Sequence, residues 1–136
     1  MADPHHPTDG ELAILRVLWS RGEPMTVREV HEVLQRTKDT AYTTVLKILT
    51  IMFEKGQVQR DESERSHRFV ASFAEPEVES SLVNDFMQRT FGGSAIKLVQ
   101  RALDGGTASP DELDQIARLI ADAKARAKPK AKKDRR

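Results

Sequence analysis

The chain has 136 residues, of which 22 are Lys or Arg and 21 are Asp or Glu, and it contains no cysteine. This length suits one ordinary domain, or a small domain with an appendage, and argues against a large multidomain enzyme; the lack of cysteine excludes disulfides, thiolate metal sites, iron–sulfur clusters and cysteine nucleophiles. Because no run of about 18 apolar residues occurs and the N-terminus lacks the layout of a signal peptide, we expect a cytoplasmic protein without membrane insertion.

The first predicted helix lies in TDGELAILRVLWSRG. Thr8 and Glu11 have the spacing of a capping box, in which each side chain accepts a hydrogen bond from the backbone N–H of the other. Gly22 is expected to end the helix, because glycine readily adopts the left-handed conformation found there. The side chains expected on its buried side are Leu12, Leu15, Leu18 and Trp19.

A second, shorter helix is predicted after Pro24, in TVREVHEVLQR. Thr26 and Glu29 repeat the capping-box spacing, so this helix should begin in the same way as the first. The side chains expected to be buried are Val30, Val33 and Leu34.

A third helix is predicted from about Thr40, where DTAYTTVLKIL begins an amphipathic segment that Gly56 closes. Its apolar stripe should consist of Ala41, Val45, Ile48, Leu49, Met52 and Phe53. Its opposite face should carry Thr43, Thr44, Lys47, Thr50 and Glu54, with Ile51 as one apolar exception.

The segment QVQRDESERSHRFVAS has apolar ends around a charged centre, which predicts a β-hairpin with strands near 57–60 and 66–70. Past Pro76, EVESSLVNDFMQRTF shows helical spacing again. Two more helices are expected over about residues 94–103 and 111–124, the last with a proline in its first turn.

Three helices followed by a hairpin are the order of a winged helix-turn-helix domain. We predict a mainly α protein with a small β-hairpin, divided into a winged helix DNA-binding domain over 1–74 and a C-terminal helical dimerisation region over 75–124. Residues 125–136 are expected to form a basic disordered tail, because 124–136 holds eight Lys and Arg against one Asp and no apolar side chain except Ala. This tail is either a solubilising end or a source of nonspecific attraction to nucleic acid.

The third helix of a helix-turn-helix lies in the major groove with its first turns nearest the bases. Thr hydroxyls can bond base edges or phosphates, and Lys can reach guanine or phosphate. Lys38 and the helix N-terminus suit a phosphate. Such side chains are also typical of solvated helix surface and of charged hairpin tips, so their position in the helix-turn-helix is what favours DNA. The predicted DNA-binding residues are Lys38, Thr40, Tyr42, Thr43, Thr44, Lys47, Arg60, Arg65, His67 and Arg68.

Other kinds of functional site are not indicated. Histidines 5–6 lie in a Pro-flanked terminus, His31 on the second helix and His67 on the hairpin, so no metal-ligand spacing emerges. Glu29 and Glu32 are typical of a solvated helix face rather than of a catalytic pair. No Gly-rich phosphate loop occurs. We therefore expect neither a cofactor nor enzymatic activity.

Four stretches in this order carry a family resemblance: LRVLWSRGEPMTVREVHEVL, AYTTVLKIL, EKGQVQRD and ERSHRFVA. They contain a Leu-Trp near the end of the first helix, Thr-Val-x-Glu-Val opening the second, Tyr-Thr-Thr-Val opening the third, Lys-Gly closing it, and His-x-aromatic on the returning strand. In these features the chain resembles the BlaI/MecI/CopY family of bacterial transcriptional repressors, well over about residues 8–73 and loosely beyond.

The resemblance implies a repressor that binds a palindromic operator as a homodimer, with the winged helices on DNA and the C-terminal helices in the dimer. It implies recognition-helix positions for Tyr42, Thr43, Thr44 and Lys47 and a wing at 65–68. The apolar side chains of the C-terminal helices favour a dimer independently, since about 50 residues of short helices cannot bury so many among themselves. The predicted dimerisation residues are Leu82, Val83, Phe86, Met87, Phe91, Ile96, Val99, Leu103, Leu113, Ile116, Leu119 and Ile120.

Three departures limit what the resemblance implies. Copper-responsive members carry a cysteine cluster near the C-terminus, so copper sensing by that route is excluded here. β-Lactam-responsive members are cut at an Asn-Phe bond beyond a Gly-Gly that Gly92-Gly93 matches; the corresponding bond is about Arg101-Ala102, so that cleavage signal is missing. Ile51 stands where many members carry Arg, which weakens a backbone contact.

Release from DNA therefore has two alternatives. A regulatory membrane metalloprotease, or a protease downstream of it, is one candidate partner, and its cut is expected between about Thr90 and Ser109, where two Gly-Gly pairs and polar residues make the chain accessible. A ligand or partner protein is the other. The rival to DNA binding as a whole is a winged helix that serves only as a protein-interaction module.

Overall fold

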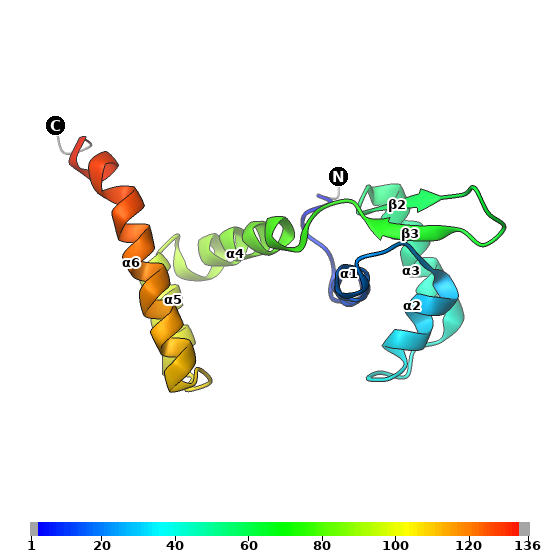
Figure 1. Cartoon of the computed structure of the whole chain (residues 1–136), viewed down its shortest axis with the longest axis horizontal. Helices are drawn as coiled ribbons and strands as arrows, with labels where there is room; N and C mark the ends of the chain where they lie inside the picture. Colours follow the sequence, from blue (N-terminus) through cyan, green and yellow to red (C-terminus); the bar gives the residue numbers. More distant parts are fainter. Residues whose placement is uncertain (1–2, 134–136) are drawn as a thin grey trace. The chain divides into compact units, whose positions relative to one another are not determined.

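The computed structural model describes residues 3–133, with side chains as far as residue 127. Its elements fall into two compact units, residues 1–89 and 90–136 (Figure 1). In chain order the elements are α1 (Asp9–Arg21), β1 (Met25–Thr26), α2 (Val27–Leu34), α3 (Tyr42–Lys55), β2 (Val58–Asp61), β3 (Arg68–Ala71), α4 (Glu75–Phe91), α5 (Ala95–Asp104) and α6 (Pro110–Lys133). The N-terminal unit thus contains the predicted winged helix-turn-helix together with most of α4.

Local signals in the sequence set the ends of the first three helices. Both predicted capping boxes are present, at the start of α1 and of α2. At the other end, Gly22 and Gly56 adopt left-handed conformations with φ of 75° and 83°, and each closes its helix through its backbone N–H. A Cβ-bearing residue would be strained at either position, so both glycines act as stop signals.

The sheet has three antiparallel strands in the order β1-β3-β2. The predicted hairpin is confirmed, with each strand slightly later in the chain than expected. The two-residue strand β1 was not predicted, because it is too short to show an alternating pattern. Its Met25 pairs with Phe69 of β3, and Phe69 pairs on the other side with Arg60 of β2. The hairpin is thereby joined to the segment that leads into α2.

The core of the N-terminal unit lies between α1, α2, α3 and the sheet. The three fully buried residues of α3, Val45, Leu49 and Met52, all belong to its predicted stripe. On α1, the predicted Leu12 is only half-buried, and Ile14, which was not predicted, is fully buried. The core residues are Ile14, Leu15, Leu18, Met25, Val27, Val30, Val45, Leu49, Met52, Val58 and Phe69.

A polar link joins the start of α1 to the end of α3. Glu11 is only 4% exposed. Its carboxylate accepts from Lys55 Nζ at 2.7 Å and from Gln57 Nε2 at 3.0 Å, in addition to its capping bond with Thr8. Burial by itself raises the pKa of Glu11, but the hydrogen bonds from Lys55, Thr8 and Gln57 together hold this pKa below its usual range. The link fixes the axial position of α3 relative to α1.

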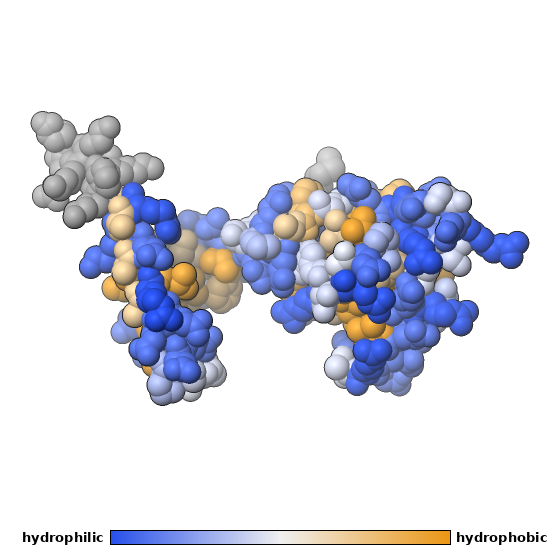
Figure 2. Space-filling model, viewed as in Figure 1, coloured by the Kyte–Doolittle hydropathy of each residue, from blue (hydrophilic) through white to orange (hydrophobic). Residues whose placement is uncertain are grey.

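The C-terminal unit contains α5 and α6, and its apolar side chains stay exposed. Between residues 90 and 127 no side chain is fully buried. Ile96 is 77% exposed and Leu119 67% exposed. Figure 2 shows apolar surface, coloured orange, on the helices of this unit. A helix pair with so little interior cannot derive much stability from burial within one chain.

The basic segment from residue 125 differs from expectation, because α6 continues to Lys133 instead of ending near residue 124. Ala, Lys and Arg have high intrinsic helix propensity, so a helix that is already formed upstream can extend into a segment that buries nothing. The expected disorder is therefore not found over 125–133. Residues 134–136 lie outside the described residues.

Candidate nucleic-acid interface

The exposed face of α3 carries the Thr and Lys side chains that the sequence predicted. Thr43, Thr44 and Lys47 are all exposed, while the opposite side of the helix is packed into the core. Lys47 takes part in no ion pair with a described residue. This face therefore presents one cation and two hydroxyls to solvent from the first two turns of the helix.

The loop that leads into α3 is held by α2. The ring of His31 donates from Nε2 to the backbone O of Thr40 at 2.8 Å, and it meets the ring of Tyr42 edge to face at 5.7 Å between centroids. The hydroxyl of Thr40 donates to the backbone O of Lys38 at 3.2 Å. Tyr42 itself is 43% exposed, in agreement with the expected partial burial. These contacts place the first turn of α3.

The N-terminus of α3 differs from those of α1 and α2, because Ala41 occupies the N-cap position and has no side-chain oxygen to offer. The first backbone N–H groups of α3 thus keep capacity for an outside acceptor. Lys38 lies exposed in the preceding loop. This arrangement is compatible with a phosphate group at the helix start.

The Arg and His side chains of the hairpin fall into two groups. Arg60 pairs with Glu62 at 2.6 Å and lies over the ring of Phe53 at 4.1 Å, and Arg68 lies 3.6 Å from Glu29 and from Glu64. Both side chains are thus held by neighbours in the same chain.

Arg65 and His67, by contrast, are exposed and have no ion pair or hydrogen bond with a described residue. Of the four predicted wing residues, these two keep all their donors for an outside partner.

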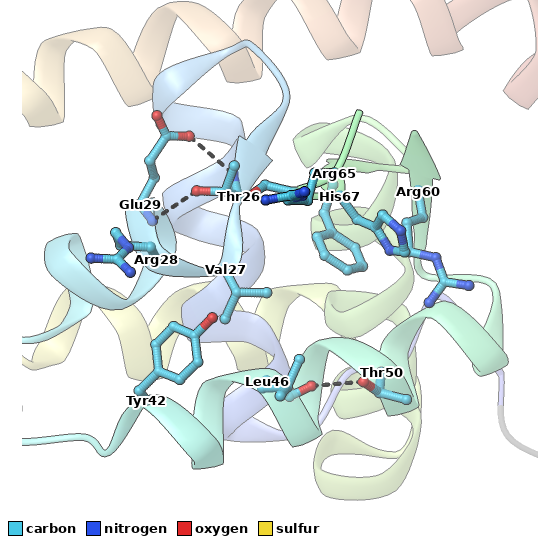
Figure 3. A pocket seen from close by; sticks show the side chains of 12 residues that line it. Thr26, Val27, Arg28, Glu29, Tyr42, Leu46, Thr50, Arg60, Arg65 and His67 are labelled. Atoms are coloured by element: carbon cyan, nitrogen blue, oxygen red, sulfur yellow. Dashed lines mark hydrogen bonds between the residues drawn. The ribbon is translucent and has the colours of Figure 1, made fainter. Parts of the chain in front are cut away.

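An open cavity of about 490 Å³ lies between α3, the start of α2 and the hairpin (Figure 3). It brings together several predicted residues from separate segments. It also includes Arg28 and Leu46, which the sequence analysis did not single out. The lining residues are Thr26, Val27, Arg28, Glu29, Tyr42, Leu46, Thr50, Arg60, Arg65, Ser66, His67 and Phe69.

Three arginines and only one carboxylate line this cavity, so its surface is electropositive. Arg28 is exposed and forms no ion pair with a described residue. A signal for Arg28 existed in the sequence, since it lies in the first turn of the helix that precedes the recognition helix. Lys38 and Thr44 line a different, smaller cavity of about 270 Å³ beside the start of α3.

The predicted dimerisation residues occupy α4, α5 and α6. Their apolar side chains are exposed or half-buried throughout, with Ile96, Leu119 and Ile120 at least half exposed. The glycines expected to make the intervening segment adaptable, Gly92 and Gly106, both adopt positive φ. These turns separate the helices that carry the apolar residues.

Among the described residues no group of three or more His, Asp or Glu side chains is placed to hold a metal ion. No described helix is long and apolar enough to cross a membrane.

A model of the penicillinase repressor family matches residues 7–122. The chain belongs to this family. It is 34% identical over 122 residues to the transcriptional regulator BlaI of Mycobacterium tuberculosis (strain ATCC 25618 / H37Rv), covering 86% of this chain and 84% of that protein. It is 17% identical over 113 residues to the methicillin resistance regulatory protein MecI of Staphylococcus aureus (strain N315), covering 83% and 91% of the two chains.

The solution structure of the DNA-binding domain of the repressor BlaI is also similar, with a TM-score of 0.49 and 21% identity, covering 57% of this chain and 93% of that one. The resemblance carried by the four sequence stretches is confirmed by the family match. As a member of the penicillinase repressor family, the chain is a repressor homologue and not an enzyme.

Proposed function

We propose that the chain represses transcription by binding a palindromic operator in double-stranded DNA as a homodimer, in the cytoplasm. The winged helix of residues 1–74 is the DNA-binding part, and residues 75–124 form the dimer. The observation that carries the proposal is that the exposed Thr and Lys side chains of α3 lie next to the electropositive cavity. Similarity to a relative named as a transcriptional regulator and to one named as a methicillin resistance regulatory protein adds support.

On the proposed interface, α3 lies in the major groove, with Thr43, Thr44 and Lys47 toward base edges. The hairpin residues Arg65 and His67 and the loop residue Lys38 lie against phosphates, where they set register without selecting sequence. Arg60 and Arg68 would have to exchange their carboxylate partners for phosphate oxygens. Their contact with DNA would therefore break the ion pairs that they now form. We therefore expect Arg65 and His67 to contribute more than Arg60 and Arg68.

Homodimer formation is supported by the exposed apolar residues of α5 and α6. Covering side chains such as Ile96, Leu119 and Ile120 with a second copy removes apolar area from water at about 25 cal/mol per Å². Two linked half-site contacts then bind far more tightly than one, because the second becomes intramolecular. Repression would end when that linkage is broken, by a protease cutting between about Thr90 and Ser109 or by a ligand or partner protein.

DNA binding is tested by fluorescence anisotropy of the full chain with the DNA upstream of its own gene and with a scrambled duplex. We expect preference for the upstream DNA and a steep loss of affinity with salt. If Thr43 and Thr44 touch bases, replacing both by Ala should reduce the difference in binding free energy between upstream and scrambled DNA by roughly 1–3 kcal/mol. Thr107→Ala is the matched surface control and should leave this difference unchanged. An unchanged difference after replacing Thr43 and Thr44 would assign these hydroxyls to solvated surface.

The dimer is tested by analytical ultracentrifugation of Leu119→Asp, with Ala121→Asp as a control that adds the same charge to the same helix. Leu119→Asp should shift the chain toward monomer and weaken operator binding, and Ala121→Asp should do neither. A footprint over a single asymmetric half-site would contradict the proposal.

The alternative function is a protein-interaction module without specific DNA binding. Failure to shift the upstream DNA at low salt would favour it. Mass spectrometry of the protein from induced cells distinguishes the release mechanisms: a shortened chain indicates proteolysis, and a full-length chain that has left its operator indicates a ligand or partner.

A further inference from the structure

One apolar side chain stands in the middle of the proposed DNA-binding face. Leu46 is 42% exposed on α3 and lines the electropositive cavity together with Tyr42 and Thr50, one turn before and one turn after it. It also lies three residues after Thr43, so it neighbours the predicted base-contacting hydroxyls on the helix surface. Figure 3 shows Leu46 between Tyr42 and Thr50 along the helix, opposite Val27.

Part of the surroundings of Leu46 is apolar or already hydrogen-bonded within the chain. The hydroxyl of Thr50 donates to the backbone O of Leu46 at 2.8 Å, so its proton is already used inside the helix. Val27, from the start of α2, adds a second apolar side chain to the cavity wall. The polar side chains of Arg28, Arg65 and His67 line the same cavity. The result is an apolar centre with cations around it.

We propose that Leu46 selects thymine at one position of each operator half-site by contacting its C5-methyl group. This proposal rests on the proposed function and names a specificity determinant for it. Of the groups that base pairs present in the major groove, the thymine methyl is the apolar one, whereas guanine, cytosine and adenine present acceptors or donors there. A cytosine N4–H or a guanine O6 placed against Leu46 would lose water without gaining a partner, which costs free energy.

The cationic surroundings decide between DNA and an apolar protein segment as the occupant. Three arginines line the cavity against one carboxylate, and Arg28 and Arg65 have no ion pair with a described residue. A polyanion neutralises such a surface, whereas an apolar segment of a protein would leave these charges poorly compensated. The apolar centre then faces the bases and the cations face the backbone.

The test begins with selection of binding sites for the full chain from a random duplex library. In the resulting consensus, each thymine is replaced in turn by deoxyuridine, which removes only the methyl group. We expect one position per half-site at which this change weakens binding about fourfold, the effect of one buried methylene-sized group. At that same position, cytosine should bind poorly and 5-methylcytosine should recover part of the loss.

Leu46→Ala and Ile51→Ala provide the matched pair, since both remove an exposed apolar side chain from α3, at 42% and 38% exposure. The preference for thymine over deoxyuridine should disappear in Leu46→Ala and persist in Ile51→Ala. Circular dichroism confirms that both variants are folded. The proposal is overturned if no thymine is sensitive to loss of its methyl, or if the sensitivity survives in Leu46→Ala.

The outcomes separate this inference from the proposed function. A clear consensus whose thymines are all insensitive to deoxyuridine supports sequence-specific binding and refutes the role of Leu46. A selection that yields no consensus refutes both.

Discussion

Replacing Glu11 by Gln tests how strongly the polar link between α1 and α3 stabilises the N-terminal unit. The substitution keeps the size of the side chain but removes the charge that faces Lys55 Nζ at 2.7 Å. It also sets an amide against the buried amide of Gln57, whose Oε1 has no partner in the structure. A hydrogen bond to a charged group contributes about 1.5–3 kcal/mol, and a buried donor left unpaired costs about 1–3 kcal/mol.

These two terms overlap, and the Lys55 side chain is 22% exposed and so regains some water. We therefore expect the free energy of unfolding to fall by about 2–3 kcal/mol at pH 7, within the range for breaking a charge-assisted network. Glu54→Gln is the matched control, because Glu54 is exposed and forms no ion pair with a described residue. It should change the stability by less than about 0.5 kcal/mol.

The difference between wild type and Glu11→Gln should depend on pH in one direction. Because the folded-state pKa of Glu11 lies below its ordinary value of 4.5, the carboxylate contributes its stabilisation fully above that value. The contribution is lost as the pH falls through the lowered folded pKa. The two proteins should therefore converge in stability in acid and differ by a constant amount above about pH 6.

Urea unfolding followed by the fluorescence of Trp19 measures this loss of stability in the N-terminal unit, where Glu11 lies. Trp19 is the only tryptophan in the chain. Its indole N–H donates to the backbone O of Phe73 at 2.9 Å, so its emission reports the packing of the N-terminal unit. A destabilisation no larger than that of Glu54→Gln, or one that stays constant down to pH 3, would refute the reasoning.

Two further predictions concern the ends of the chain. The His5 ring bonds Glu77 Oε2 at 2.8 Å, which raises the pKa of His5 above 6.5; Glu77→Gln should lower this pKa in an NMR titration, and no change would contradict the contact. Since the folded pKa is raised, this contact stabilises below pH 6.5 and is lost as the pH rises through the raised value. Deleting residues 129–136 should weaken binding to operator and random DNA alike and reduce the salt slope, without altering the preferred sequence. If ultracentrifugation instead shows a shifted monomer–dimer equilibrium, the tail acts in the dimer.

The parts of the fold that could be predicted are those that depend on local chemistry. Capping boxes and terminal glycines satisfy backbone groups within a few residues, so Thr8, Thr26, Gly22 and Gly56 mark helix ends without knowledge of the rest of the chain. Strand β1 could not be predicted in this way, because two residues become a strand only when β3 supplies their hydrogen-bond partners. The length of α6 was not predicted either, because the segment from residue 125 buries no apolar face, and the high helix propensity of Ala, Lys and Arg does not by itself mark where a helix ends.

For the candidate site, the periodicity of α3 distinguishes the residues of its buried face from those of its exposed face. It does not predict whether residues between these two faces are buried. Leu46 lies between them, and an apolar residue there would ordinarily be assigned to the core. Whether it is covered depends on the distance of the hairpin from α3. That distance depends on the pairing of β3 with β1, which brings together residues more than 40 positions apart.

The same tertiary arrangement decides which hairpin cations are available. Arg60 and Arg68 look equivalent to Arg65 in the sequence, but Glu62, Glu64 and Glu29 lie close enough to pair with the first two. An exposed ion pair of this kind contributes only about 0–1 kcal/mol, so a phosphate can compete for either arginine at small cost. Removing Arg65 should therefore reduce DNA affinity more than removing Arg60 or Arg68. The difference in binding free energy should be no larger than the contribution of one exposed ion pair. The choice of sequence must then come from α3 itself, where the side chains that face the groove differ in chemistry and not only in charge.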